Sequence, residues 1–125
     1  MIIESLVQPI CRLFMPPPFA PSVQRRPLQD SPLAGFQYYR GRAVWSFLRE
    51  GEALRLVREP FNFFDTHAVA VYFRNEKLGY LPRARNRAVA QMLDRGRTLH
   101  AEISRLQRSN DPWDRVQVRV SLVQH

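Results

Sequence analysis

Residues 54–82, LRLVREPFNFFDTHAVAVYFRNEKLGYLP, decide the fold of this chain. Leu54–Arg58 alternates apolar residues with arginine, as half-exposed strands do, and Ala68–Phe73 is rich in the β-branched and aromatic residues that strands favour. Asn75-Glu76 is a tight turn that leads into a third strand signal, Lys77–Leu81. The stretch therefore predicts a strand, a loop and a β-hairpin.

The loop between the first two strands is unusual because it combines turn residues with large aromatics. Asn62 and Asp65 are residues that turns favour, whereas Phe61, Phe63 and Phe64 expose apolar surface unless they pack or meet a ligand. Burial in the core is the commoner fate of phenylalanine. We therefore expect some of the three rings to pack, and contact with a ligand is the alternative.

Strand signals continue on both sides of this stretch. Leu33–Gln37 predicts a strand, and Ala43–Leu48 fits either a short helix or a loop packed on the core. Thr98–Leu106 and Val116–Leu122 alternate apolar and polar residues, so both are predicted to be strands. The turn signal Ser109–Pro112 separates them.

One clear helix is predicted after Pro82, where apolar residues recur at helical spacing and Gly96 suits a helix C-cap. The apolar face consists of Ala84, Ala88, Val89, Met92 and Leu93, and the opposite face carries Arg83, Arg85, Arg87 and Arg95. Five or six short strands with one helix predict a mainly-β fold, a small OB-like β-barrel.

Residues 1–30 have the composition of a Pro-rich N-terminal arm, and residues 31–125 are expected to form the folded domain. Proline lacks an amide donor, so the arm is expected to stay extended and not to join a central strand, with one short helical turn in residues 4–14. Its apolar residues are too many for a free tail. We expect them to pack on the domain or on a second copy, which would make an oligomer.

Composition favours a polyanionic partner. The 125-residue chain carries a net charge of +8, and only Lys77 among its 19 basic residues is lysine. Arginine forks match phosphate geometry and stack on bases, although a genome rich in arginine codons gives the same bias. The single cysteine, Cys11, allows no internal disulfide and fits the cytoplasm. We expect no signal peptide and no membrane contact.

Motifs typical of enzymes are missing from the sequence. It holds no glycine-rich phosphate loop, no nucleophile elbow and no HExxH pair, and its three histidines are scattered. Asp65 and His67 could form the acid–base pair of a hydrolase, but a hydrogen bond that stabilises the loop is the better interpretation. We therefore expect no enzymatic activity, no cofactor and no bound metal.

Several stretches resemble the HIRAN family, a small module found beside helicase motors in eukaryotic fork-remodelling proteins and as freestanding bacterial proteins. The likeness covers about residues 31–124. It rests on residues 33–39 (LAGFQYY), 56–60 (LVREP), 62–65 (NFFD), 68–71 (AVAV) and 78–82 (LGYLP). In the fork-remodelling members this module has a modified OB-like fold that captures the 3′ end of single-stranded DNA.

The resemblance implies a set of nucleic-acid-binding residues. Tyr38 and Tyr39 would stack on or line the terminal nucleotides, and Asp65 would lie at the 3′-hydroxyl, with Phe61 and Asn62 lining the pocket. Residues that occupy nucleotide-facing positions are Tyr80 and Trp113.

The chain also departs from the DNA-binding members. Gln37 stands in place of an arginine and cannot neutralise a phosphate. The other changes are Phe61 for asparagine, Phe63 for proline, His67 for asparagine and Tyr80 for histidine.

Apart from the resemblance, the residue types also favour binding of a single strand, because aromatic rings stack on any base while arginines follow the backbone. Arginines expected to contribute are Arg40, Arg58, Arg83 and Arg85. The resulting hypothesis is a single-stranded DNA-binding module that recognises 3′ ends, serves repair or replication-fork processing, and works beside a separate helicase or nuclease. The alternative is a protein-interaction or oligomerisation module that binds no nucleic acid.

Overall fold

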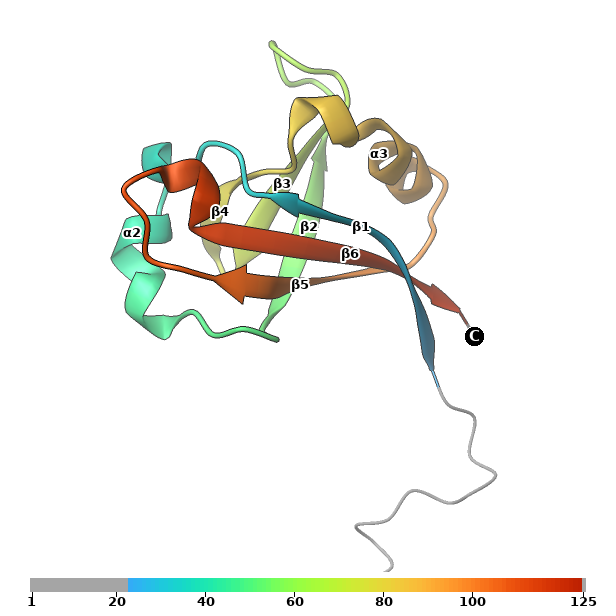
Figure 1. Cartoon of the computed structure of the whole chain (residues 1–125). Coiled ribbons are helices and arrows are strands. Elements are labelled where there is room, and N and C mark those ends of the chain that lie inside the picture. The colour runs from blue at the N-terminus through green and yellow to red at the C-terminus, as the bar shows by residue number, and fades with distance from the viewer. Residues whose placement is uncertain (1–22, 125) are drawn as a thin grey trace, which may run out of the picture.

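The computed structural model describes residues 23–124, which fold around one six-stranded antiparallel sheet (Figure 1). The strand order is β1-β6-β5-β2-β3-β4. Strand bounds are β1 Gln24–Pro32, β2 Ala53–Glu59, β3 Ala68–Phe73, β4 Glu76–Tyr80, β5 Leu99–Leu106 and β6 Val116–Gln124. The sheet therefore confirms the mainly-β, OB-like fold with six strands.

The two edges of the sheet meet just after β1. Leu33 donates its amide to the carbonyl of Val116 in β6 (3.0 Å), and the next residue, Ala34, exchanges two backbone hydrogen bonds with Tyr80 in β4 (2.8 and 2.9 Å). Gly79 allows this approach, since its φ is 154° and a Cβ there would collide with the carbonyl oxygen of Ala34. One bridge thus joins the segment that follows β1 to β4, the strand at the other edge of the sheet.

The core fills the interior of this curved sheet. Alternating residues of β6, Val116, Val118 and Val120, are fully buried, and β3 is buried on both faces over Ala68–Val71. Phe36 is buried as well, and its ring meets Trp45 edge-on, with the centroids 5.9 Å apart.

Short helices cover the two ends of the sheet (Figure 1). One end carries the 3₁₀ helix η1 (Phe36–Tyr38), α2 (Gly41–Val44) and η2 (Trp45–Phe47), so the helical reading of the ambiguous segment is confirmed. The other end carries η3 (Arg83–Arg85) and α3 (Arg87–Asp94), and η4 (Pro112–Asp114) lies in the β5–β6 connection. The predicted helix stop is also confirmed. Gly96, at φ 75°, donates to Leu93, and Arg97 donates to Met92.

Two expectations near the N-terminal end of the fold need correction. The predicted strand Leu33–Gln37 is instead a single bridge at Ala34 followed by η1, because Gly35 turns the chain with a φ of 77°. Residues 24–30, which composition assigned to the arm, are paired with β6. Their prolines are tolerated because β1 lies at a sheet edge and is irregular between Pro27 and Gln29. The rest of the arm lies outside the described residues.

Between residues 23 and 124, no helix has the length and apolar character that crossing a membrane requires.

Candidate functional site

Asn62 organises the connection between β2 and β3. Its side-chain oxygen accepts hydrogen bonds from the amides of Phe64 (2.9 Å) and Asp65 (3.1 Å), which is the bonding pattern of an Asx turn. Its side-chain nitrogen donates to Glu59 Oε1 at 3.0 Å. The loop is therefore held by polar contacts, and none of its order depends on burying a phenylalanine.

The expectation that some loop phenylalanines pack into the core is wrong. Phe61, Phe63 and Phe64 are 97%, 94% and 80% exposed. Phe63 and Phe64 meet only each other edge-on, with ring centroids 5.5 Å apart. The hydrogen bonds of Asn62 fix the loop backbone so that all three rings point into solvent.

Arg58 clamps the base of the same loop. Its guanidinium forms a two-pronged ion pair with Asp94 at the end of α3 (2.9 and 3.2 Å) and donates to the carbonyls of Thr66 (3.0 Å) and Ala68 (2.8 Å). These hydrogen bonds hold the pKa of Asp94 below its usual value. Because four of its five N–H donors are already bonded within the protein, Arg58 has little left to offer a DNA backbone, and the expected contact stays a prediction.

Replacing Arg58 with lysine should lower the melting temperature by roughly 5 °C, because an ammonium cannot reproduce the fork that holds Asp94 and two carbonyls. Arg83→Lys is the matched control, since Arg83 is exposed, and it should leave the melting temperature unchanged. Thermal denaturation followed by circular dichroism measures both. Equal melting of R58K and the unmodified protein would show that the clamp contributes nothing.

Glu59, Lys77 and Tyr80 form a hydrogen-bonded cluster beside the loop. Lys77 Nζ donates to Glu59 Oε2 at 2.8 Å and to the Tyr80 hydroxyl at 2.6 Å, and that hydroxyl donates to Glu59 Oε1 at 2.7 Å. The ammonium also lies 4.4 Å from the ring centre of Tyr80 and 5.0 Å from that of Tyr39. The two tyrosine rings meet edge-on with centroids 5.7 Å apart. The cluster thus fixes an aromatic pair next to Asn62.

The charges of this cluster are mutually stabilised. Burial raises the pKa of Glu59, but hydrogen bonds from Lys77, Tyr80 and Asn62 outweigh it and bring the pKa below 4.5. Burial lowers the pKa of Lys77, yet its bonds to Glu59 and Tyr80 leave that pKa raised. Burial and the Glu59 carboxylate raise the pKa of Tyr80 to about 12 despite the opposing effect of Lys77.

Stability should therefore depend on Glu59 in a pH-dependent way. A carboxyl whose pKa is lowered by folding stabilises the fold above pH 4.5 and loses that contribution as pH falls through the folded value. Glu59→Gln should cost about 1 kcal/mol at pH 7, a modest figure because the group is partly exposed. The difference from the unmodified protein should shrink below pH 4.

Urea denaturation at pH 7 and at pH 3.5 tests this expectation. At the alkaline side the cluster should stay intact until pH exceeds 10, since the pKa values of both Lys77 and Tyr80 are raised. A pH-independent difference between E59Q and the unmodified protein would contradict the charged state assigned to Glu59.

Tyr38 and Trp113 lie on a neighbouring part of the surface. Tyr38 in η1 is 78% exposed and Trp113 in η4 is 46% exposed, and the two 3₁₀ helices are in contact. Asp111 fixes η4 by accepting a hydrogen bond from the amide of Trp113 at 3.0 Å. Since η1 also contacts β4, the Tyr38–Trp113 surface adjoins the Tyr39–Tyr80 pair.

Asp65 lies on the side of the loop that faces η3 and the start of α3. Its Oδ1 accepts from the backbone amide of His67 (2.9 Å), and its Oδ2 accepts from the side chain of buried Asn86 (2.7 Å). The contact with His67 is thus the loop-stabilising bond that the sequence favours over an acid–base pair. Asp65 also lines a hollow of about 420 Å³ between the loop and the start of α3.

Some of the candidate residues lie close together in the structure, and others lie apart from them. Asn62 touches Tyr80 and, through its oxygen, the amide of Asp65, so it links the aromatic pair to the carboxylate. Gln37 is exposed in η1 and Phe61 points away into solvent. Sequence reasoning gave no role to Glu59, Lys77 or Asn86. Lys77 is the single lysine among the basic residues of the chain. This exception was the signal that could have pointed to Lys77 and to its partner Glu59.

The exposed arginines differ in their partners. Arg40 pairs with Glu76 at 3.0 Å, and Arg85 donates to the carbonyl of Asp30 at 3.2 Å, whereas Arg83 is exposed beside the Asp65 hollow. Within the described part of the chain, no group of three or more histidine, cysteine or acidic residues could hold a metal ion.

Comparisons with known proteins identify the fold independently. The model of the HIRAN domain family matches residues 28–124. The structure is similar to the crystal structure of a protein from Lactobacillus plantarum, with 25% identity and a TM-score of 0.72 over 83% of this chain and 100% of that one. It is also similar to the HIRAN domain of human HLTF, with 19% identity and a TM-score of 0.64 over 84% and 82% of the two chains, a level that shows the fold alone. No curated protein matches.

Proposed function

The chain belongs to the HIRAN domain family, and from this premise we propose that it binds single-stranded DNA and recognises its 3′ end. The observation that carries the proposal is the aromatic surface of Tyr38, Tyr39, Tyr80 and Trp113, which lie on adjoining segments and of which Tyr39 and Tyr80 are in ring contact. These side chains come from three separate segments of the chain, and polar contacts hold them in place.

Such a surface suits unpaired bases. Exposed rings stack on any base face, and each stacked base contributes about 1–3 kcal/mol. The bound strand end would be read by Asp65, whose carboxylate accepts hydrogen bonds and so favours a hydroxyl over a phosphate. Asn62 supports both parts, since it contacts Tyr80 and holds the backbone of Asp65.

Gln37 supplies no positive charge, so arginines elsewhere must neutralise the backbone of the strand. The described residues are rich in exposed arginines, and the whole chain has a net charge of +8. We place the module in DNA repair or fork processing, with a separate helicase or nuclease acting on the strand it holds.

Fluorescence anisotropy with labelled oligothymidylate tests the proposal. Affinity should fall as salt rises, with the slope of log affinity against log salt steepening by about 0.7 for each phosphate neutralised. A strand with a free 3′-hydroxyl should bind more tightly than the same strand with a 3′-phosphate or a circular strand. Absence of binding at low salt would refute the proposal.

The exposed phenylalanines favour a second candidate, a protein-interaction module. Phe61, Phe63 and Phe64 form an apolar tip on a loop that projects from the sheet (Figure 1). Binding of this kind would be insensitive to salt, and F61A/F63A/F64A would abolish it. Phe63 and Phe64 also line the hollow beside Asp65, so F61A alone, whose ring lies outside that hollow, should leave binding of a 3′-hydroxyl strand largely intact if the aromatic surface of the four residues named above is the DNA site.

A further inference from the structure

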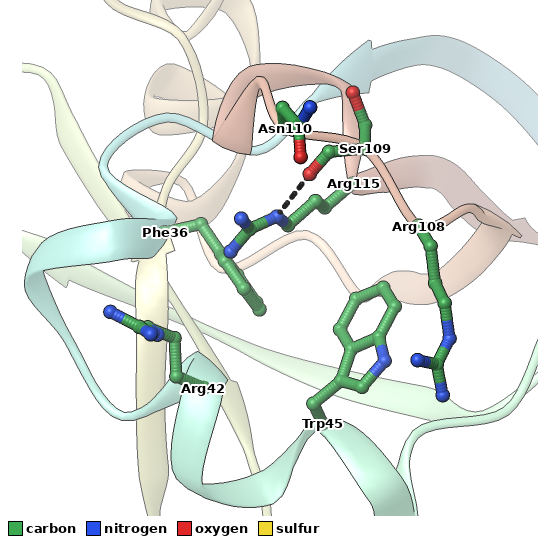
Figure 2. Close-up of a pocket in the computed structure, with 7 residues that line it drawn as sticks. All are labelled: Phe36, Arg42, Trp45, Arg108, Ser109, Asn110 and Arg115. Atoms are coloured by element: carbon green, nitrogen blue, oxygen red, sulfur yellow. Dashed lines mark hydrogen bonds between the residues drawn. The ribbon is translucent and has the colours of Figure 1, made fainter.

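A second hollow of about 470 Å³ opens between η1, α2 and η2 on one side and the β5–β6 connection on the other. Figure 2 shows the residues that line it, with three guanidinium groups around two aromatic rings. The arginines are Arg42, Arg108 and Arg115, and the rings are those of Phe36 and Trp45. No residue that the sequence predicts to bind DNA lines this hollow.

The charge of this hollow is unbalanced. No carboxylate lines it. Arg115 is fixed in place because its Nε donates to the carbonyl of Ser109 at 2.9 Å, which leaves its terminal nitrogens available (Figure 2). Between residues 23 and 124, neither Arg42 nor Arg108 takes part in an ion pair.

The β5–β6 connection holds two acidic side chains, Asp111 and Asp114, and neither lines the hollow. Asp111 bonds the amide of Trp113, and Asp114 is exposed. Three like charges around one cavity repel each other, and an anion bound among them would remove that repulsion. A phosphate suits such a site, because its oxygens can accept paired bonds from a guanidinium fork.

Two segments that line the hollow, η1 and the β5–β6 connection, also carry residues of the aromatic surface. Phe36 and Tyr38 belong to the same 3₁₀ helix, and Trp113 lies between Arg108 and Arg115 in the connection. A strand held by its 3′ end can leave the aromatic surface only in the 5′ direction. We propose that the hollow binds a backbone phosphate of that same strand on the 5′ side of the bound end. The inference rests on the proposed function and adds a second point of contact to it.

The test compares two double variants of equal charge. R42Q/R108Q removes two arginines from the hollow, and R95Q/R97Q removes two exposed arginines after α3, at the other end of the sheet. Each protein is titrated with a ten-residue oligothymidylate that has a 3′-hydroxyl, at several salt concentrations. R42Q/R108Q should bind about tenfold more weakly, with a salt slope shallower by about 0.7, the change expected for one phosphate, while R95Q/R97Q matches the unmodified protein.

A scan of neutral methylphosphonate linkages locates the phosphate. In the unmodified protein, one linkage on the 5′ side of the end should weaken binding several-fold when neutralised. In R42Q/R108Q the same substitution should have a much smaller effect, because only Arg115 is left to bind that phosphate.

The outcomes separate the two proposals. Unchanged affinity of R42Q/R108Q, or an equal loss in R95Q/R97Q, would overturn the phosphate site and leave end recognition intact. If the linkage scan weakened binding equally in both proteins, the site would also be overturned. If the unmodified protein bound no strand at low salt, the proposed function and this inference would fall together.

Discussion

Replacing Tyr38 and Trp113 together with alanine should weaken the binding of a 3′-hydroxyl strand by about a hundredfold or more. Both side chains are exposed, on 3₁₀ helices that contact each other, so both are available to stack on bases. Loss of two stacking partners should cost about 3 kcal/mol if each contributes about 1–3 kcal/mol. Anisotropy titration with oligothymidylate measures the change.

This double variant should lose affinity for the strand but keep its stability. Neither ring is part of the buried core, so the melting temperature should change little. Phe47→Ala is the matched control, because Phe47 is an aromatic side chain of similar exposure in η2 that lies outside the aromatic surface. If the double variant bound the strand as tightly as F47A, the aromatic surface would not be the binding site.

The sequence predicted most of the sheet because its strands alternate or are strongly β-branched. β2, β3, β4, β5 and β6 all appear where the apolar pattern placed them, within a few residues at each end. β1 was missed because its burial pattern is mostly exposed and prolines interrupt it. Its pairing depends on β6, more than eighty residues away, and local patterns carry no information about such a partner.

The candidate site was less predictable from the sequence. Local patterns identify Asn62 as a turn residue. They do not predict where the neighbouring phenylalanines point, because that depends on how the turn bends the backbone. Arg58 was expected to bind a polyanion because its strand, Leu54–Arg58, has the pattern of a half-exposed strand, on which arginine is usually free. Its real partner, Asp94, comes close only when α3 packs against β2 and β3.

Asp65→Asn should reduce the preference for a 3′-hydroxyl over a 3′-phosphate by about tenfold or more. The carboxylate repels a phosphate and accepts a charge-assisted hydrogen bond from a hydroxyl, a bond that contributes about 1.5–3 kcal/mol. The amide of asparagine has no charge and only one acceptor oxygen. Paired titrations with 3′-hydroxyl and 3′-phosphate strands measure the preference directly.

Asp65 has a structural role that the same variant must preserve. Its two oxygens accept from the amide of His67 and from buried Asn86. In D65N the new side chain can keep one acceptor for His67, and rotation of the Asn86 amide by half a turn would present an oxygen to the new NH₂ group. We therefore expect the melting temperature of D65N to stay close to that of the unmodified protein.

Asp65→Ala provides the contrast that separates the two roles of this residue. It leaves the buried amide of Asn86 and the amide of His67 without an acceptor, which should destabilise the fold by about 1–3 kcal/mol. A residue that only orders the loop would lower stability in D65A and leave the end preference of D65N intact. A residue that reads the strand end loses the preference in D65N while the fold stays stable. Equal binding of both ends by the unmodified protein would rule out end reading by Asp65 altogether.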